Sequence, residues 1–391
     1  MRITPKTETF ARIRVVGVGG SGNNAIHRMM HVGIDKVEFV SVNADAQQLA
    51  NSRADRKVHI GRKTTGGLGA GMNPEIGRAS AEESRDEIFE AIKNSDMIFI
   101  TCGLGGGTGT GAAPVIAEVA KKAGILTVAV VTKPFAFEGA KRREIAERGH
   151  EELKAHVDTI ITIPNDRVLQ IIDKKTPLLQ AFKTVDDVLR QAVSGIAELV
   201  TVPGLINVDF ADVRTIMQDS GTALMGIGTE AGENRALEAA RAAIGSPLLE
   251  MSIDGAKGIL FNVTGGKTLG MHEVDEAARH ITKMVDPEAK IIFGAVIDEA
   301  IEEQIKITVV ATGFEGGPRK KAVDSVASFQ VERERERERD REPEPLVREQ
   351  PSEKPRPRQP MFNTKSLPGA GDGGKDDDEY DIPAFIRKKM K

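Results

Sequence analysis

The 391-residue chain contains no tryptophan, one tyrosine and one cysteine. Aromatic residues make up 4% of the sequence and hydrophobic residues 40%, so its core must be built mostly from aliphatic side chains. The single cysteine, Cys102, excludes an internal disulfide framework and is typical of a protein from a reducing compartment. We expect Cys102 to be a small core residue rather than a reactive thiol.

The charges of the chain nearly balance, leaving a formal net charge of -4, which gives no electrostatic reason to expect a nucleic-acid partner. The N-terminal segment lacks the apolar centre of a signal peptide, and we expect residues 1–10 to be flexible. No apolar run is long enough to cross a bilayer. These features predict a soluble, cytoplasmic protein whose membrane contacts are indirect or made through its tail.

Apolar runs and helical stretches alternate in residues 11–175, which we interpret as the first domain. The runs are nearly continuous, as in strands covered on both faces, and the alternation predicts a doubly wound parallel sheet. Start signals predict one helix from Asn73-Pro74, with asparagine as cap and proline at the first helical position, and another from Pro114. The five predicted strands are residues 12–18, 37–43, 97–102, 126–131 and 159–164.

The rest of the chain divides into four further segments. A long central helix is predicted for residues 176–203, followed by a second, smaller α+β domain over residues 204–317. Residues 318–375 are rich in Glu, Arg, Pro, Lys and Gly and cannot bury enough apolar surface to offset the entropy of ordering, so we expect a disordered linker. Apolar residues return in residues 376–391 between an acidic and a basic run, as in short docking peptides.

The first glycine-rich loop, GVGGSGNNA at residues 17–25, follows a predicted strand and precedes a helix. Glycines let the backbone approach an anion, and a helix N-terminus supplies free N–H groups and partial positive charge. The loop also satisfies the pattern G-x-G-x-x-G, and Asp45 after the next strand could bind a ribose. Taken alone, this region therefore also fits a nicotinamide-dependent oxidoreductase, or a turn that serves only close packing.

A second loop, GLGGGTGTG at residues 103–111, favours a triphosphate, because it offers many backbone and hydroxyl donors. A third glycine-rich stretch, residues 66–73, also ends at a helix N-terminus. Three such loops converging on the carboxyl edge of one sheet fit a large polyanion. The segment Gly265-Gly266-Lys267-Thr268 is similar to the end of a Walker A motif, but Phe261 holds the place of the first glycine, so we interpret it as an ordinary turn.

In this order, the motifs resemble those of the tubulin/FtsZ family. The signature is GGGTGTG, and GVGGSGNNA, TKPF, NVDFADV and the tail's DIPAFIR match the FtsZ branch, whereas tubulins lack this tail. The resemblance covers about residues 11–317 and the last residues, and the linker carries none. Ser21 stands where many relatives have glycine, and a small hydroxyl should preserve the function of the loop. The resemblance implies a bacterial GTPase that polymerises head to tail into the septal ring.

The resemblance also implies a GTP/GDP site. The loop N–H groups of residues 20–24 and 107–109 would cradle the phosphates, and Glu138 and Arg142, one helical turn apart, would hold the ribose. Phe182 would stack on the base and Asp186 would accept hydrogen bonds from guanine. Without the family, the pair would be an ordinary i,i+4 ion pair and Phe182 a core residue. The nucleotide-binding residues so implied are Gly20, Ser21, Gly22, Asn23, Asn24, Ala70, Gly71, Gly103, Gly106, Gly107, Thr108, Gly109, Thr110, Thr132, Glu138, Arg142, Asn165, Phe182 and Asp186.

Hydrolysis requires a water molecule oriented for in-line attack. By the resemblance, Asn207, Asp209 and Asp212 enter the nucleotide site of the neighbouring subunit, with the two aspartates as catalytic carboxylates. From spacing alone the aspartates also make a good helix start, as N-cap and N3 acid. Mg²⁺ is expected with the triphosphate, and we expect no dedicated metal site in the protein. A scaffold that binds GTP and scarcely hydrolyses it is the non-enzymatic alternative.

The tail completes the set of expected partners. By the resemblance, an apolar island in the last residues binds membrane tethers and division regulators at midcell, while the other partner is a second copy of the chain. No nucleic acid and no direct membrane span are expected. The partner-binding residues so implied are Asp381, Ile382, Pro383, Phe385 and Ile386.

Overall fold

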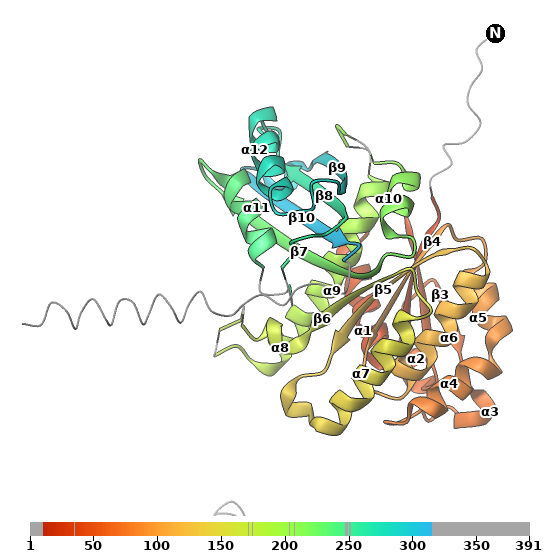
Figure 1. Ribbon diagram of the computed structural model, residues 1–391. Helices are drawn as coiled ribbons and strands as arrows, with labels where there is room; N and C mark the ends of the chain where they lie inside the picture. Colours follow the sequence, from red (N-terminus) through yellow and green to blue (C-terminus); the bar gives the residue numbers. More distant parts are fainter. Residues whose placement is uncertain are drawn as a thin grey trace, which may run out of the picture. The chain divides into compact units, whose positions relative to one another are not determined.

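The computed structural model describes residues 11–314, except residues 35, 171, 174, 203, 207, 247, 248, 250 and 251. Within this part of the chain, ten strands form one sheet (Figure 1). The predicted linker and tail, and residues 1–10, lie outside the described residues. From one edge to the other, the strands are β3 (Arg56–His59), β2 (Val37–Asn43), β1 (Ile13–Val18), β4 (Met97–Gly103), β5 (Leu126–Lys133), β6 (Thr159–Pro164), β7 (Gly221–Ala231), β10 (Gln304–Thr312), β8 (Gly258–Gly265) and β9 (Lys290–Ile297).

The first six strands are parallel to one another, in the order β3-β2-β1-β4-β5-β6. The chain winds outward from β1 in one direction and from β4 in the other, so the prediction of a doubly wound sheet is confirmed. All five predicted strands are present. Strand β3 was not predicted, because its four residues include Arg56 and Lys57 and form no apolar run. The point at which the winding reverses lies between β1 and β4.

Helices cover both faces of the parallel half. Each face has its own hydrophobic core, and successive side chains of β1 point into different ones. Val15 lies in the core with α1 and α9, and Val16 lies in the core with α5, α6 and α7. The helices of this half are α1 (Gly19–Val32), α2 (Ala46–Ala50), α3 (Arg62–Thr65), α4 (Pro74–Glu83), α5 (Arg85–Ile92), α6 (Thr108–Lys122), α7 (Ala140–Lys154) and α8 (Asn165–Val168), with a short 3₁₀ helix η1 (Ala136–Glu138).

The predicted start of α4 is confirmed and that of α6 is wrong. Asn73 caps α4 by accepting a hydrogen bond from the N–H of Glu75, with Pro74 at the first position. In contrast, α6 begins at Thr108 and includes Pro114 in its interior. The start of α6 was predicted too late because residues 108–113 have no apolar periodicity that would mark them as helical, which left Pro114 as the apparent start signal. Their small side chains instead let α6 pack closely on α4.

The remaining elements form the smaller, C-terminal half. The predicted central helix is confirmed as α9 (Leu178–Thr201), and α10 (Phe210–Met217) follows it. One face of the strands β7, β10 and β8 packs on α11 (Arg235–Gly245) and α12 (Met271–Thr282), while the other face joins the core of α9 and α10. A 3₁₀ helix, η2 (Glu299–Ile301), connects β9 and β10. Among the described residues, no helix combines the length and apolarity needed to span a membrane.

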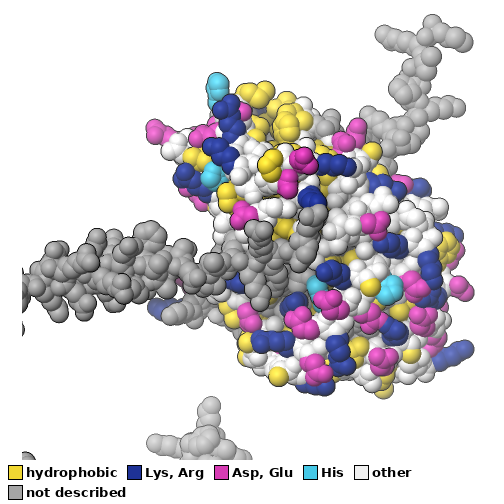
Figure 2. Space-filling view, in the orientation of Figure 1, with side chains coloured by type: hydrophobic (Ala, Val, Ile, Leu, Met, Phe, Trp, Pro, Cys, Tyr) yellow, Lys and Arg dark blue, Asp and Glu magenta, His cyan; other side chains and the backbone are white. Residues whose placement is uncertain are grey.

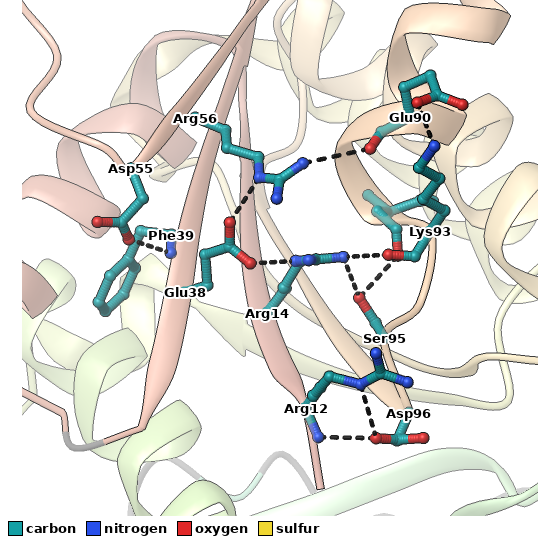
Figure 3. Close-up of polar contacts among 11 residues, drawn as sticks. Arg12, Arg14, Glu38, Phe39, Asp55, Arg56, Glu90, Lys93, Ser95 and Asp96 are labelled. Carbon is teal, nitrogen blue, oxygen red and sulfur yellow. Dashed lines mark hydrogen bonds and ion pairs between the residues drawn. The ribbon is translucent and has the colours of Figure 1, made fainter.

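An ion network around the buried Arg14 ties the amino ends of the first strands together (Figure 3). Arg14, only 7% exposed, donates to Glu38 at 2.5 Å, to the hydroxyl of Ser95 at 2.9 Å and to the carbonyl of Lys93 at 2.6 Å. Arg56 also donates to Glu38, at 2.5 Å. Partial burial acts to raise the pKa of Glu38, but the hydrogen bonds from the two arginines outweigh it and lower the pKa below its usual value. This carboxylate therefore stabilises the fold above its unfolded pKa.

We expect Glu38→Gln to lower the free energy of unfolding by about 1–3 kcal/mol, because it leaves the buried Arg14 without a charged partner. Chemical denaturation at pH 7 measures the loss. The effect should shrink as pH falls through the lowered pKa of Glu38, where the wild-type carboxylate is protonated too. Glu238→Gln, which removes a half-exposed i,i+3 pair with Arg241, is the control and should cost below about 0.5 kcal/mol. Equal losses in the two variants would contradict the assignment.

Candidate nucleotide site

Two helices begin at the point where the winding of the sheet reverses. Strands β1 and β4 are neighbours, and each runs through glycines into a helix, α1 from Gly19 and α6 from Thr108. Neither helix has a side-chain cap or an acidic residue in its first turn. Their first N–H groups therefore lack the partners that helix starts usually have, and two positive dipole ends point to the same edge. This arrangement binds anions.

Hydrogen bonds hold the three glycine loops together. The Oγ of Ser21 accepts from the N–H of Gly103 at 2.8 Å, and the N–H of Gly107 donates to the carbonyl of Gly71 at 2.8 Å. The predicted convergence of the loops is thereby confirmed. The same contacts refine the predicted roles, because the N–H groups of Gly103 and Gly107 are already used within the protein. On the second loop, we therefore expect the phosphates to meet the first N–H groups of α6, from Thr108 onward.

Close backbone approach explains a glycine in the second loop. A Cβ on Gly107 would lie 2.4 Å from the carbonyl oxygen of Gly71 and 2.7 Å from that of Ala70. Ala70 and Gly71 of the third loop thus lie directly against the second loop.

Thr110 contributes to the internal structure of the second loop. It is buried, and its Oγ1 accepts from the N–H of Gly105 at 2.9 Å, so one lone pair of this hydroxyl serves the loop itself.

A cavity of ≈ 340 Å³ opens beside these loops. It also reaches the ends of β5 and η1 and the starts of α7, α8 and α9. Gln48 also lines the cavity but was not predicted from the sequence. Its side chain accepts from the Asn43 amide and donates to the Gly20 carbonyl. Its position three residues after the cap Asp45 gives no sequence signal of a binding role. Also missed were Leu104, Pro134, Val185 and Leu189. The residues expected at the nucleotide that line the cavity are Gly20, Ser21, Asn24, Gly103, Thr132, Glu138, Arg142, Asn165, Phe182 and Asp186.

The residues expected at the nucleotide that do not line the cavity still belong to the loops beside it. Gly22 and Asn23 are buried in the first turns of α1, and Ala70 and Gly71 lie against the second loop. The others belong to the second loop or the start of α6. These others are Gly106, Gly107, Thr108, Gly109 and Thr110.

One end of the cavity is shaped for a flat, polar ring. Phe182 is 43% exposed and touches Phe135 edge-to-face, with ring centroids 5.7 Å apart, so it is not the core residue that sequence alone suggested. Asp186 lies one turn further along α9. Burial raises the pKa of Asp186 to about 6, and the charge of Arg28 opposes that shift only in part. A desolvated carboxylate beside an exposed aromatic ring suits a base that presents N–H donors.

The opposite wall carries polar groups for a sugar. Glu138 and Arg142 lie 3.1 Å apart, as an ion pair that also lines the cavity. They do not lie on one helix as predicted, because Gly139, with φ 97, separates η1 from α7. The buried Oδ1 of Asn165, and both amide atoms of the buried Asn23, have no partner in the described structure. Buried polar atoms of this kind normally bind something, so these residues fit a polar ligand such as a nucleotide.

The expected catalytic residues lie far from this cavity. Asp209 stands at the N-cap position of α10, as spacing predicted, but its side chain makes no capping hydrogen bond, and Asp212 is in the first turn. Asn207 lies outside the described residues. The cavity is lined by α9 from Phe182 to Leu189, and α10 follows the other end of that helix (Figure 1). By the usual rise per residue, Thr201 at the end of α9 lies roughly 28 Å beyond Phe182 and roughly 18 Å beyond Leu189. No described residue of the segment 204–212 lines the cavity.

Two other sequence features have structural roles. Cys102 is completely buried in β4, and burial raises the pKa of its thiol to about 12, which confirms a core residue. The segment Gly265–Thr268 is a turn after β8, as predicted, and Lys267 pairs with Glu299 at 2.8 Å. The part of the chain that the structure describes holds no group of three His, Cys, Asp or Glu side chains placed to bind a metal ion.

Comparison with known proteins decides what the site is. Residues 12–173 match the GTPase domain of the tubulin/FtsZ family, and residues 221–315 match the C-terminal domain of the FtsZ family. An empty FtsZ dimer from M. jannaschii is 49% identical, covering 81% of this chain and 94% of its own, with a TM-score of 0.76. The chain belongs to the FtsZ family.

Further relatives agree with this assignment. A point mutant of FtsZ from M. jannaschii is 51% identical over 78% of this chain and 92% of its own, with a TM-score of 0.75. CetZ2 from Haloferax volcanii, at 22% identity over 83% of this chain and 98% of its own, has a TM-score of 0.67 and shares the fold. Members of the family are GTPases that bind GTP and GDP, and this chain is one of them. The oxidoreductase interpretation and the non-hydrolysing scaffold are therefore wrong.

The raised pKa of Asp186 predicts how GTP binding depends on pH. Asp186 is expected to accept hydrogen bonds from guanine, and as pH falls through about 6 its free carboxylate takes up a proton, so GTP affinity should fall. Asp186→Asn should weaken GTP by at least about tenfold at pH 7.5 and remove this dependence. Titration with a fluorescent GTP analogue from pH 5.5 to 8 measures both effects.

Comparing Asp186→Asn with the wild type isolates the effect of the carboxylate, because the phosphates of GTP titrate in the same way in both measurements. Without nucleotide, Asp186→Asn should raise the melting temperature at pH 7, because a carboxylate whose pKa is raised on folding destabilises the fold when it is charged. Parallel pH profiles for the variant and the wild type would show that Asp186 does not recognise the base.

Proposed function

We propose that this chain hydrolyses GTP within head-to-tail filaments, in which the pocket of one subunit is completed by Asn207, Asp209 and Asp212 of the next. The observation that carries the proposal is the separation of the two parts of the site by the length of α9. A subunit that holds pocket and carboxylates at opposite ends can join them only through a second copy. The contact is heterologous, so it repeats into a filament unless the rotation closes a ring.

Exposed apolar side chains at both ends support such a contact. On the side of the pocket, Leu68 in the third loop, Phe137 in η1 and Leu179 in α9 are 89%, 66% and 69% exposed. At the loop before α10, Leu205 is 74% exposed. Hydrophobic side chains also gather on the C-terminal half, at the top of Figure 2. Met271, the first residue of α12, is 77% exposed. Water-exposed apolar groups of this size favour burial against a partner. Similar proteins have been solved as an FtsZ dimer and a CetZ2 protofilament.

The residues of the shared site divide the work. The starts of α1 and α6 would hold the phosphates and stabilise the charge that develops on them, while Phe182 and Asp186 fix the base. Asp209 and Asp212 of the neighbour would orient the attacking water and accept its proton. Bound with the phosphates, Mg²⁺ would neutralise part of their charge, which fits a pocket without an acidic cluster of its own.

Asp212→Ala should bind GTP with unchanged affinity and lose at least about a hundredfold in turnover, because it removes a carboxylate that touches the attacking water. Phosphate release across a range of protein concentrations, with sedimentation alongside, measures turnover and assembly together. For the wild type, activity should appear at the concentration at which filaments pellet.

A mixing experiment tests whether the site is shared. Wild-type protein held just below its threshold should gain activity when Asp212→Ala is added, because the inactive variant offers pockets to wild-type loops. The same quantity of an inert protein is the control for crowding. Wild-type turnover linear in protein with nothing pelleting, together with no gain on mixing, would mean that one chain contains the whole site.

We further propose that the filaments form the division ring at midcell, attached to the membrane by partners of the C-terminal peptide. The segment with Asp381, Ile382, Pro383, Phe385 and Ile386 lies outside the described residues, and the proposal depends on its composition: an apolar island between charged runs, after a long polar linker. Such a peptide can reach a tether without disturbing the filament.

Deleting residues 380–391 should abolish binding of the tether and midcell localisation while leaving GTP turnover within about twofold of wild type. Co-sedimentation with tether-coated vesicles and microscopy of a fluorescent fusion measure these effects. A scrambled peptide of the same composition is the control for charge. If the deletion also removed GTPase activity, the tail would not be a separate docking segment.

A further inference from the structure

We infer that the edge strand β9 holds the catalytic loop in its working position, with Gly204 as the positioning residue. The inference rests on the proposed function, since it concerns the loop that carries Asp209 to the neighbouring subunit. The loop lies between α9 and α10, and β9 is the last strand of the sheet, so one of its edges faces away from β8.

Three backbone hydrogen bonds join the loop to this edge. The carbonyl of Ala295 accepts from the N–H of Leu205 at 2.9 Å and from that of Ile206 at 3.3 Å, and the N–H of Ala295 donates to the carbonyl of Ile206 at 3.2 Å. In a parallel strand, the N–H and C=O of one residue point to the same side. Both groups of Ala295 thus point away from β8 and serve the loop.

Gly204 is required at this contact because the two backbones approach too closely for a side chain. A Cβ at this position would lie 2.4 Å from the carbonyl oxygen of Ala295, the acceptor of two of the three bonds. The obstruction is backbone, which cannot rotate away as a flexible side chain could. Alanine at position 204 must therefore displace the loop from β9.

A second contact holds the other side of the loop. At Gly294, a Cβ would lie 3.3 Å from Cγ2 of Val208 and 2.9 Å from Cδ2 of Leu199 on α9. Val208 directly precedes Asp209, and its side chain is buried. The loop is thus fixed to neighbouring residues of one strand on both sides of position 207, and Asp209 emerges from the second contact.

The same strand carries two further apolar side chains that are exposed in the single subunit. Ile291 and Phe293 of β9 are 41% and 38% exposed, and Leu205 extends from the clamped part of the loop. A neighbouring subunit that packed on these side chains would contact the same strand that holds the loop before Asp209.

The test is Gly204→Ala, with Gly245→Ala as the matched control. A Cβ at Gly245, in the same half of the molecule, would meet no atom within 4 Å. We expect Gly204→Ala to lower kcat by about tenfold to a hundredfold, since small displacements of a reacting group have effects of this size. KM and GTP affinity should stay within about twofold, because the pocket lies at the other end of α9. The control should leave all three unchanged.

A second pair of variants keeps the inference testable if Gly204→Ala folds poorly. Ala295→Pro removes the N–H that serves the loop without breaking the ladder to β8, and edge strands tolerate proline. Ala295→Gly keeps both backbone groups. We expect kcat to fall in the proline variant and to be retained in the glycine variant.

Normal kcat in folded Gly204→Ala or Ala295→Pro would overturn the clamp, as would a parallel loss of GTP affinity. Asp212→Ala in the same assay separates the clamp from the shared site. If it is inactive while the clamp variants are normal, the shared site stands and the clamp fails. If it is fully active, the proposed function fails first.

Discussion

The length of α9 is the constraint from which the arrangement of this molecule follows. The first half of the helix lines the nucleotide cavity, and its other end leads to the loop before α10. The carboxylates proposed to orient the attacking water therefore follow the end of α9, roughly 18 Å along the helix beyond Leu189, its last residue at the cavity. Its apolar face is buried between the parallel half and the smaller half, in a core that includes residues of both. A continuous helix packed on two sides cannot shorten. In the proposed filament, the packing that joins the two halves of a subunit would also keep its nucleotide pocket apart from its own Asp209 and Asp212.

The cavity lies at two helix N-termini whose first turns contain no acidic side chain, so it suits a ligand that brings negative charge. Neither helix start has a side-chain cap, so the first N–H groups of both can serve an anionic ligand. Asn23 and Asn165 add buried polar atoms without partners, and Asp186 is held where its charged form is unfavourable. A nucleotide bound as proposed would satisfy these groups together. Ligand affinity and fold stability are thus coupled through the same few groups.

Much of this architecture could be predicted from the sequence, because its strongest patterns are local. Long apolar runs gave five of the six parallel strands, and the repeated glycines located the loops before any contact was known. Prediction failed where local signals were weak or tertiary contacts decided the outcome. β3 is short and charged, α6 starts in a run of small residues, and Gly139 divides what reads as one helix around Glu138 and Arg142. The bonds that occupy the N–H groups of Gly103 and Gly107 join residues distant in sequence, so no local pattern reveals them.

Glycine has two separate uses in this chain, and only one of them concerns the ligand. Glycine-rich loops are usually interpreted as letting a backbone approach a phosphate. Gly107, however, is pressed against the carbonyls of Ala70 and Gly71, and Gly204 against that of Ala295, so in both places the close neighbour is another part of the protein. These contacts fix a phosphate loop at one end of α9 and the catalytic loop at the other. Because backbone contacts of this kind admit no side chain and little displacement, they hold both halves of a shared site at defined positions before a second subunit arrives.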